Sequence, residues 1–207
     1  MYNPLSMKRT RLLAAPVIFF LSACAANVIV RRPPDPAKPM RVAVLPFKPH
    51  PGFPASGELA YEAFSTNLLQ LKGYSVIDRG ALDQLIKEQK LTQTGVIDQE
   101  KAVEIGKLLG AEGVVLGTVT EYIPRNYLLF PPAKVSLNAR LINTRTGEVE
   151  WTASHTRGGL NRWFTWIVWP AGIVATVISP SAEDQVERTS RAISRTLNRE
   201  MAKQRTQ

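Results

Sequence analysis

The spacing of hydrophobic residues divides the chain into two patterns, and the first is an alternation of short apolar runs with helical periodicity. Residues 41–47, RVAVLPF, are a valine-rich run that ends near a proline, which is typical of a buried strand. Further elements are predicted in this order: a helix over 58–72, a strand over 74–79, helices over 81–89 and 99–109, and a strand over 113–122. Because strands that alternate with helices pair in parallel, this half predicts parallel βαβ units.

The second pattern is strict alternation of polar and apolar residues. It occurs in KVSLNARLI (134–142) and again in VEWTASHT (149–156), separated by the turn-forming stretch NTRTGE. Alternation predicts strands with one buried and one solvated face, and the short separation predicts an antiparallel hairpin. In the first of these strands the solvated side chains are Lys134, Ser136, Asn138 and Arg140.

The chain closes with a predicted amphipathic helix over 181–204. Ser181 stands where the N-cap is expected, and Asp184 follows three residues later, as in a capping box. The fold class predicted from both patterns is α/β, with a mixed sheet, parallel βαβ units in the N-terminal half, an antiparallel hairpin and a C-terminal helix. We assign this domain to residues 40–207.

The N-terminus has the layout of a secretory signal peptide. A basic stretch, MKRTR, precedes ten mostly apolar residues (12–21), which are too few for a bilayer span of about 20 residues. Small residues then lead to Cys24, the single cysteine of the chain. The quartet Leu-Ser-Ala-Cys resembles a bacterial lipobox, which implies removal of residues 1–23 and acylation of Cys24 with palmitate-type chains. Because Ala25 follows the cysteine, the resemblance implies the periplasmic face of the outer membrane.

A proline-rich segment connects this cysteine to the domain. Residues 24–39 contain four prolines in their second half, so we interpret them as an extended, semi-rigid tether. At about 3.1 Å per residue such a tether reaches at most roughly 50 Å. The domain is therefore expected to stay close to the membrane.

An apolar segment over 163–178, WFTWIVWPAGIVATVI, is the third notable feature. It carries three of the four tryptophans, Trp163, Trp166 and Trp169, and no charge. As a helix it would cover about 24 Å, less than the roughly 30 Å hydrocarbon core, and a proline interrupts it. Three interpretations stay open: burial against the sheet, a subunit contact, or insertion into the membrane interface, which tryptophan favours.

Composition and charge change the picture only slightly. The 207 residues carry a formal net charge of +9, of which three charges lie in the signal peptide. Four arginines of the last helix, at 188, 191, 195 and 199, share one face by their spacing of three and four residues. A solvated face, a subunit contact, or contact with anionic lipid or glycan would each explain them. For an exported protein we do not expect nucleic acid as a partner.

No catalytic or cofactor motif is recognised. The stretch GKLLGAEG (106–113) matches neither a phosphate-binding loop nor a dinucleotide fingerprint, and no His/Cys cluster has metal-ligand spacing. We interpret His50, in a proline-rich loop, and His155, near a strand end, as surface or edge histidines. The sequence therefore predicts a protein that is not an enzyme and that needs no cofactor.

Four stretches resemble one known family: VAVLPF, YSVIDRGALDQLIKEQKL, EIGKLLGAEGVVLGTVTEY and LNARLINTRTGEVEWTAS. In this order, over roughly residues 40–156, they are similar to the CsgG family of bacterial outer-membrane lipoproteins. The most specific pieces are the D-R-x-x-L-x-x-L-x-x-E-Q run, the LGA triplet and the TGE turn. The resemblance implies an envelope lipoprotein and its fold more firmly than a particular task.

The function that follows is a lipid-anchored periplasmic protein that scaffolds or regulates an envelope complex. Its expected partners are outer-membrane lipid, through acylated Cys24, other envelope proteins and further copies of itself. A first alternative is a protomer of a curli-like secretion channel, but residues 123–133 are too short for the membrane hairpin that such a channel member inserts there. A second alternative is an activator of a cell-wall synthase, a role that usually requires a long tether.

Overall fold

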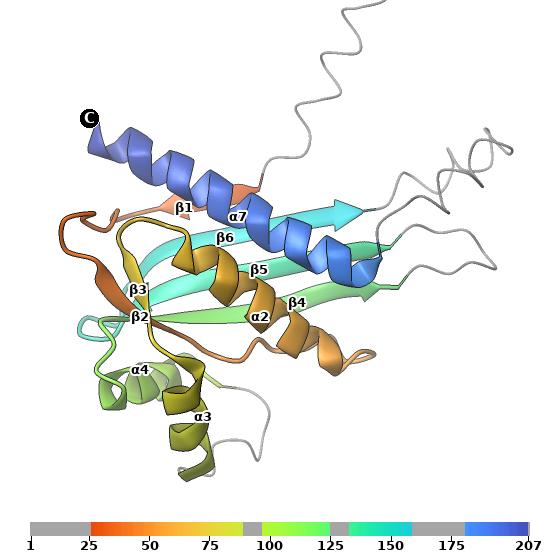
Figure 1. Ribbon diagram of the computed structural model, residues 1–207, viewed down its shortest axis with the longest axis horizontal. Helices are drawn as coiled ribbons and strands as arrows, with labels where there is room; N and C mark the ends of the chain where they lie inside the picture. Colours follow the sequence, from red (N-terminus) through yellow and green to blue (C-terminus); the bar gives the residue numbers. More distant parts are fainter. Residues whose placement is uncertain (1–25, 89–96, 125–132, 159–180, 207) are drawn as a thin grey trace, which may run out of the picture.

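The computed structural model of the chain describes residues 26–88, 97–124, 133–158 and 181–206. These residues form a six-stranded sheet in the order β1-β6-β5-β4-β2-β3 with helices packed on it (Figure 1). The elements are β1 (Asn27–Val30), β2 (Met40–Val44), α2 (Ala55–Leu69), β3 (Tyr74–Val76), α3 (Arg79–Glu88), α4 (Gln99–Leu108), β4 (Gly113–Ile123), β5 (Lys134–Asn143), β6 (Val149–Gly158) and α7 (Ala182–Arg205).

The predicted mixed α/β fold class is confirmed. Strand β2 pairs in parallel with β3 and β4, as the alternation of strands and helices predicts. Strands β4, β5 and β6 pair in antiparallel fashion, so the predicted hairpin is present as β5 and β6. The antiparallel part lies at one side of the sheet and the short parallel strands lie at the other.

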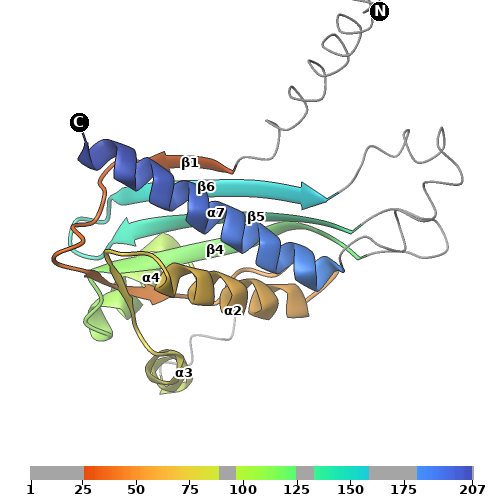
Figure 2. The same cartoon turned by 45° about the horizontal axis from the view of Figure 1, so that its top comes forward.

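Helices α2 and α7 lie side by side across one face of the sheet (Figures 1 and 2). Their apolar stripes are buried against it: Phe64 and Leu68 of α2, and Ile193 and Leu197 of α7, are all fully buried. Residues four positions apart share a helix face, which is why each helix contributes a continuous stripe to the core.

Trp151 of β6 stands at the centre of this core and is 1% exposed. Its indole Nε1 donates a hydrogen bond to the hydroxyl oxygen of Tyr74 at 3.0 Å, and its ring lies 6.2 Å from that of Phe64. Burial raises the pKa of Tyr74, so this hydroxyl keeps its proton. The contact links β6, α2 and β3, which lie far apart in the sequence.

Side-chain caps and a glycine mark the helix termini. The Asp98 carboxylate accepts a hydrogen bond from the Lys101 backbone N–H at 2.9 Å at the start of α4. At the start of α7, Ser181 and Asp184 form the complete capping box that the sequence predicts. Gly73, which follows α2, has a φ of +105°, a conformation that costs glycine least.

The Asp-Arg pair that opens α3 has a structural role. Asp78 accepts a hydrogen bond from the backbone N–H of Gly80 at 2.7 Å. The Arg79 guanidinium forms ion pairs with Glu58 and Glu62 of α2 and lies 5.1 Å from the centre of the Tyr61 ring. These contacts attach the start of α3 to α2.

One part of the sequence interpretation is wrong. Residues 27–30, which we assigned to the tether over 24–39, form the edge strand β1, paired in antiparallel fashion with β6. The carbonyl of Val30 also accepts a hydrogen bond from Gln204 of α7 at 2.6 Å. The folded domain therefore begins near Ala26, which is 6% exposed, and not at residue 40. Four residues beside a proline-rich stretch are too short a pattern to signal a strand that pairs with a distant partner.

Candidate functional site

Three of the segments that lie outside the described residues adjoin the same end of the sheet. Lys134 lies at this end, where it pairs with Ile123 on one side and Gly158 on the other. Strand β1 enters the sheet next to the same end of β6, and α7 begins there too (Figure 1). The three segments that start or finish at this end are residues 1–25, 125–132 and 159–180.

The predicted lipidation and contact residues belong to these segments. Cys24, Trp163, Trp166 and Trp169 all lie outside the described residues. Only two residues separate Cys24 from Asn27, the first residue of β1. A fully extended chain covers at most about 11 Å over that interval, since each residue adds no more than about 3.6 Å. The connection between Cys24 and the sheet is therefore much shorter than the tether of roughly 50 Å that the sequence suggests.

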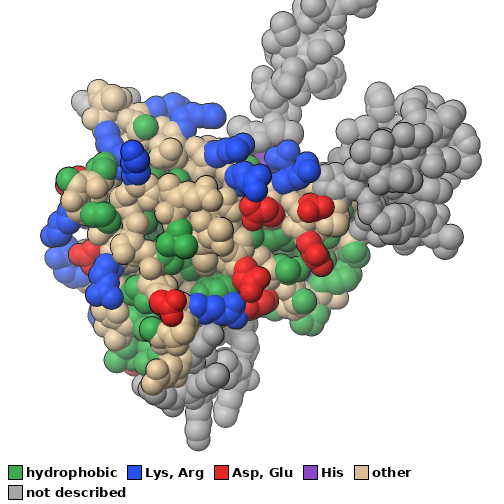
Figure 3. All heavy atoms as spheres, viewed as in Figure 1, with side chains coloured by type: hydrophobic (Ala, Val, Ile, Leu, Met, Phe, Trp, Pro, Cys, Tyr) green, Lys and Arg blue, Asp and Glu red, His purple; other side chains and the backbone are tan. Residues whose placement is uncertain are grey.

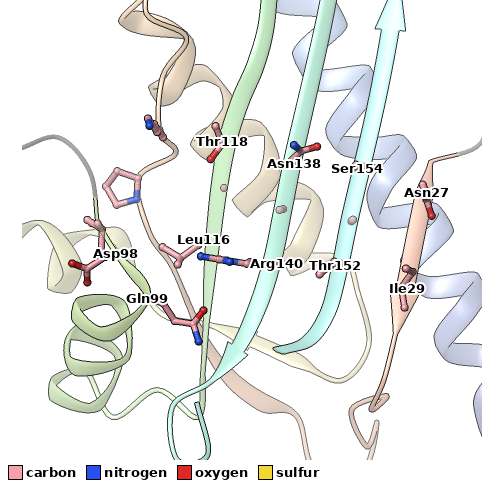
Figure 4. A pocket seen from close by; sticks show the side chains of 16 residues that line it. Asn27, Ile29, Asp98, Gln99, Leu116, Thr118, Asn138, Arg140, Thr152 and Ser154 are labelled. Carbon is pink, nitrogen blue, oxygen red and sulfur yellow. The ribbon is translucent and has the colours of Figure 1, made fainter. Parts of the chain in front are cut away.

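The sheet face opposite α2 and α7 holds a groove of about 710 Å³ that runs over β4, β5, β6 and β1 beside the N-terminus of α4 (Figure 4). The strand register places its side chains in two cross-strand rows. One row consists of Leu116, Arg140, Thr152 and Ile29, and the other of Thr118, Asn138, Ser154 and Asn27.

Most of these side chains are short, uncharged and able to both donate and accept hydrogen bonds. Leu116 and Ile29 are apolar, and Arg140 is the charged member of the two rows; it extends across β4 toward α4 (Figure 4). Ile29 is 60% exposed, which is high for a large aliphatic side chain on a strand. Such a surface can bind a protein segment by hydrogen bonds and an apolar contact, but it brings together no acid–base pair for catalysis. The sequence predicted the solvated side chains of β5 and missed the contribution of β1.

The two histidines do not converge on one site. His50 Nδ1 accepts a hydrogen bond from the backbone N–H of Gly52 at 3.2 Å and so supports a loop. His155, interpreted as a surface or edge residue, is instead buried and 6% exposed, because it follows Trp151 and Ala153 on the inner face of β6. Burial, and then the nearby charge of Arg157, lower the pKa of His155. Its Nε2 has no hydrogen-bond partner among the described residues.

The described ranges contain neither a metal-binding cluster nor a membrane-spanning helix. No group of three or more His, Cys, Asp or Glu side chains within them could hold a metal ion. In the same residues, no helix combines the length and hydropathy that crossing a membrane requires. The arginine face predicted on α7 is present: Arg188, Arg191, Arg195 and Arg199 are all exposed, and Arg191 pairs with Glu187 at 2.7 Å.

Known proteins similar to this chain agree with the fold. The family model described as "Curli production assembly/transport component CsgG" matches residues 26–124, a range that includes β1. A lipoprotein of Neisseria meningitidis serogroup B (strain ATCC BAA-335 / MC58), NMB1124/NMB1162, is 26% identical over 186 residues, covering 86% of this chain and 83% of that protein.

Two solved structures are also similar to this chain. A PelC variant from Paraburkholderia phytofirmans, solved as a dodecamer, has a TM-score of 0.54 at 16% identity and covers 84% of this chain and 98% of its own. Lipoprotein GNA1162 from Neisseria meningitidis has a TM-score of 0.48 at 19% identity, covering 68% of this chain and 99% of its own. The resemblance predicted from the sequence is therefore confirmed for the stretch that the CsgG family model matches, residues 26–124, and the fold of the described residues is similar to that of PelC.

Proposed function

We propose that this protein is a lipoprotein anchored by acylated Cys24 to the periplasmic face of the outer membrane, where it acts by binding and assembly. It scaffolds or regulates an envelope complex and catalyses no reaction. The observation that carries the proposal is the short connection between Cys24 and β1. An acylated cysteine two residues before the sheet would hold one end of the domain against the membrane surface.

The same end of the sheet borders residues 159–180, which contain the apolar segment 163–178. If Cys24 lies in the membrane, this segment leaves the domain beside the lipid surface. This favours a membrane contact for Trp163, Trp166 and Trp169, since tryptophan prefers the interface between water and hydrocarbon. A contact with a second copy of the chain at the same end is the alternative, and PelC, a protein of the same fold, was solved as a dodecamer.

The open face of the sheet is the surface that we assign to a protein partner. It lies to the side of the membrane-proximal end, so it would stay accessible in an anchored protein. Its hydroxyl and amide side chains and the exposed Ile29 suit a polar, moderately strong contact. Activation of a distant cell-wall synthase is disfavoured, because a connection of about 11 Å cannot carry the domain across the periplasm.

The anchor is tested by comparing the wild-type protein with Cys24→Ala in cells. Mass spectrometry of the wild-type protein should find an N-terminus at Cys24 that carries acyl chains. Density-gradient separation should place it with the outer membrane. Cys24→Ala should keep residues 1–23 or leave the outer-membrane fraction. A wild-type protein with an unmodified N-terminus, or one that stays with the inner membrane, would contradict the proposal.

The secretion-channel alternative has its own test. We expect no stable ion conductance when the purified lipoprotein is added to planar bilayers, because only residues 124–133 connect the paired ends of β4 and β5. A membrane hairpin needs about 20 residues. Reproducible single-channel steps that require this protein would favour the channel over the scaffold.

A further inference from the structure

The seam between α2 and α7 contains two grooves of opposite character. The groove nearer the start of the helices has a volume of about 280 Å³, and its charged lining is acidic: Glu62, Glu183 and Glu187. The second groove, about 410 Å³, lies farther along both helices and has no acidic side chain in its lining. Figure 3 shows this face of the molecule, with acidic side chains grouped beside a row of basic ones. We call the second groove the arginine groove; its polar lining is Asn67, Gln70, Arg191, Ser194, Arg195 and Asn198.

The floor of the arginine groove contains buried polar groups. Ser194 is 5% exposed, and its Oγ has no hydrogen-bond partner among the described residues. This Oγ exposes less than 1 Å² of surface, so a ligand oxygen in the groove cannot contact it. Asn67 is 2% exposed and uses its Nδ2 to bond the carbonyl of Ala63 at 2.7 Å. The groups that can reach a ligand are therefore those at the rim of the groove.

The two arginines at the rim, Arg191 and Arg195, differ in their ion pairing. Arg191 is held by Glu187 at 2.7 Å, and the same carboxylate also accepts weak hydrogen bonds from Asn67 at 3.3–3.4 Å. Arg195 is exposed and forms no ion pair within the described part of the chain. Its positive charge thus faces a groove whose lining holds no acidic side chain and includes the side-chain amides of Gln70 and Asn198, each of which can donate to an anion.

We propose that the arginine groove binds a phosphate group. The guanidinium of Arg195 supplies the charge and a two-pronged donor that matches phosphate oxygens. The exposed side-chain amides of Gln70 and Asn198 donate to the remaining oxygens. A tetrahedral phosphate can accept these bonds from two helices at once, whereas a planar carboxylate offers only two oxygens in one plane. Glu187 repels an anion next to Arg191, which places the phosphate at the Arg195 side.

The position of the groove indicates where the phosphate comes from. It lies along the helical layer, away from the end of the sheet that borders residues 1–25 (Figure 1). A headgroup in the anchoring membrane would have to reach around the domain to enter it. A phosphate carried by a soluble ligand, such as a phosphorylated glycan, meets no such obstacle. We therefore expect a soluble source; this expectation rests on the proposed anchor, whereas the phosphate site itself does not.

The test measures phosphate binding to the full-length protein in dodecyl maltoside by isothermal titration calorimetry, at constant ionic strength. Arg195→Gln should lower the association constant for inorganic phosphate by about tenfold, because a charge-assisted hydrogen bond is lost. Arg199→Gln, which makes the same change of charge on the same helix outside the groove, should change it by less than about twofold. A parallel titration uses mixed micelles that contain phosphatidic acid.

Asn198→Ala separates binding from folding. Asn198 is exposed, so without phosphate its replacement should leave the melting temperature nearly unchanged. With phosphate, the same change should lower affinity by about threefold, since one donor is gone. An asparagine that takes no part in the site would not lower affinity.

Each result decides the proposal. Binding of inorganic phosphate that falls in Arg195→Gln and not in Arg199→Gln supports a soluble source. Binding of phosphatidic acid alone, with the same dependence on Arg195, supports the phosphate site and assigns it to a lipid. Equal losses in Arg195→Gln and Arg199→Gln would show a diffuse attraction of charge and overturn the proposal, as would a wild-type protein that binds neither probe.

Discussion

Thr189 lies in the middle of α7, on the side that packs against the sheet, and it offers a direct test of this packing. It is fully buried, and its Oγ1 has no hydrogen-bond partner among the described residues. Burial of a hydroxyl without a partner costs about 1–3 kcal/mol. Valine has the same branched shape and a similar helix propensity, and its extra methyl group adds buried apolar surface. Thr189 lines no described groove, so no ligand compensates for its hydroxyl.

We therefore expect Thr189→Val to raise the free energy of unfolding by about 1 kcal/mol, the lower part of that range because a hydroxyl can rotate toward a weak acceptor. For a chain of this size, this corresponds to a rise of about 2–4 °C in melting temperature. Thermal unfolding followed by circular dichroism measures it.

Thr196→Val, at a half-exposed position of the same helix, is the control and should change stability by less than about 0.5 kcal/mol. A loss of stability in Thr189→Val that the control does not share would refute the reasoning, since it would mean that the hydroxyl has a hydrogen bond worth keeping.

Two further predictions concern close packing and pH. In Gly106→Ala, the new Cβ would lie 2.3 Å from Cγ2 of Val114, so we expect overpacking to lower the free energy of unfolding by about 1–3 kcal/mol, measured by urea unfolding. His155 has a lowered pKa in the folded state because burial, and then Arg157, disfavour its charged form, so the unfolded chain binds protons more readily. Stability should therefore be complete above about pH 6.5 and fall as the pH drops below that value, and His155→Asn should flatten this slope in a pH series of melting curves. An unchanged slope in the variant would assign the pH effect to other groups.

The sequence predicted the elements whose patterns are long or strongly punctuated. The alternation in 134–142 gave both the strand and its solvated side, and Asn138 and Arg140 are exposed as expected. The capping residue Ser181 marked the start of the C-terminal helix, because a side-chain oxygen before a helical pattern has a local effect on the first turn. These predictions succeeded because the information lies within a few residues.

Features that depend on distant contacts could not be predicted in the same way. Strand β1 has four residues, and its partner strand begins more than a hundred residues later. We interpreted His155 as a surface or edge residue. It lies four residues after Trp151 on the same strand, however, and alternation places both side chains on the inner face. The arginine spacing on α7 was visible in the sequence. That Gln70 of α2 lies across the seam from Arg195 was not, because it depends on how the two helices pack.

The N-terminal segment is attached to the C-terminal end of α7, and this attachment gives a last prediction. Gln204 donates to the carbonyl of Val30 at 2.6 Å, and Arg205 donates to the carbonyl of Pro34 at 2.8 Å. These two bonds hold the end of β1 and the residues that follow it against α7. Each contributes about 0.5–1.5 kcal/mol, with the exposed arginine at the lower end.

Replacing both Gln204 and Arg205 with alanine should therefore loosen this segment by about 1–2 kcal/mol, which corresponds to roughly 5–30-fold faster hydrogen exchange. The amide of Arg31, which bonds the carbonyl of Glu150 at 2.7 Å, reports the opening of β1, while amides of β5 should not change. Lys203→Ala is the matched control, because its ammonium pairs within α7 and not with the N-terminal segment. If the double variant leaves the exchange of β1 unchanged, pairing with β6 alone holds the strand. Faster exchange in β1 alone would show that α7 stabilises the edge strand that directly follows the anchor residue Cys24.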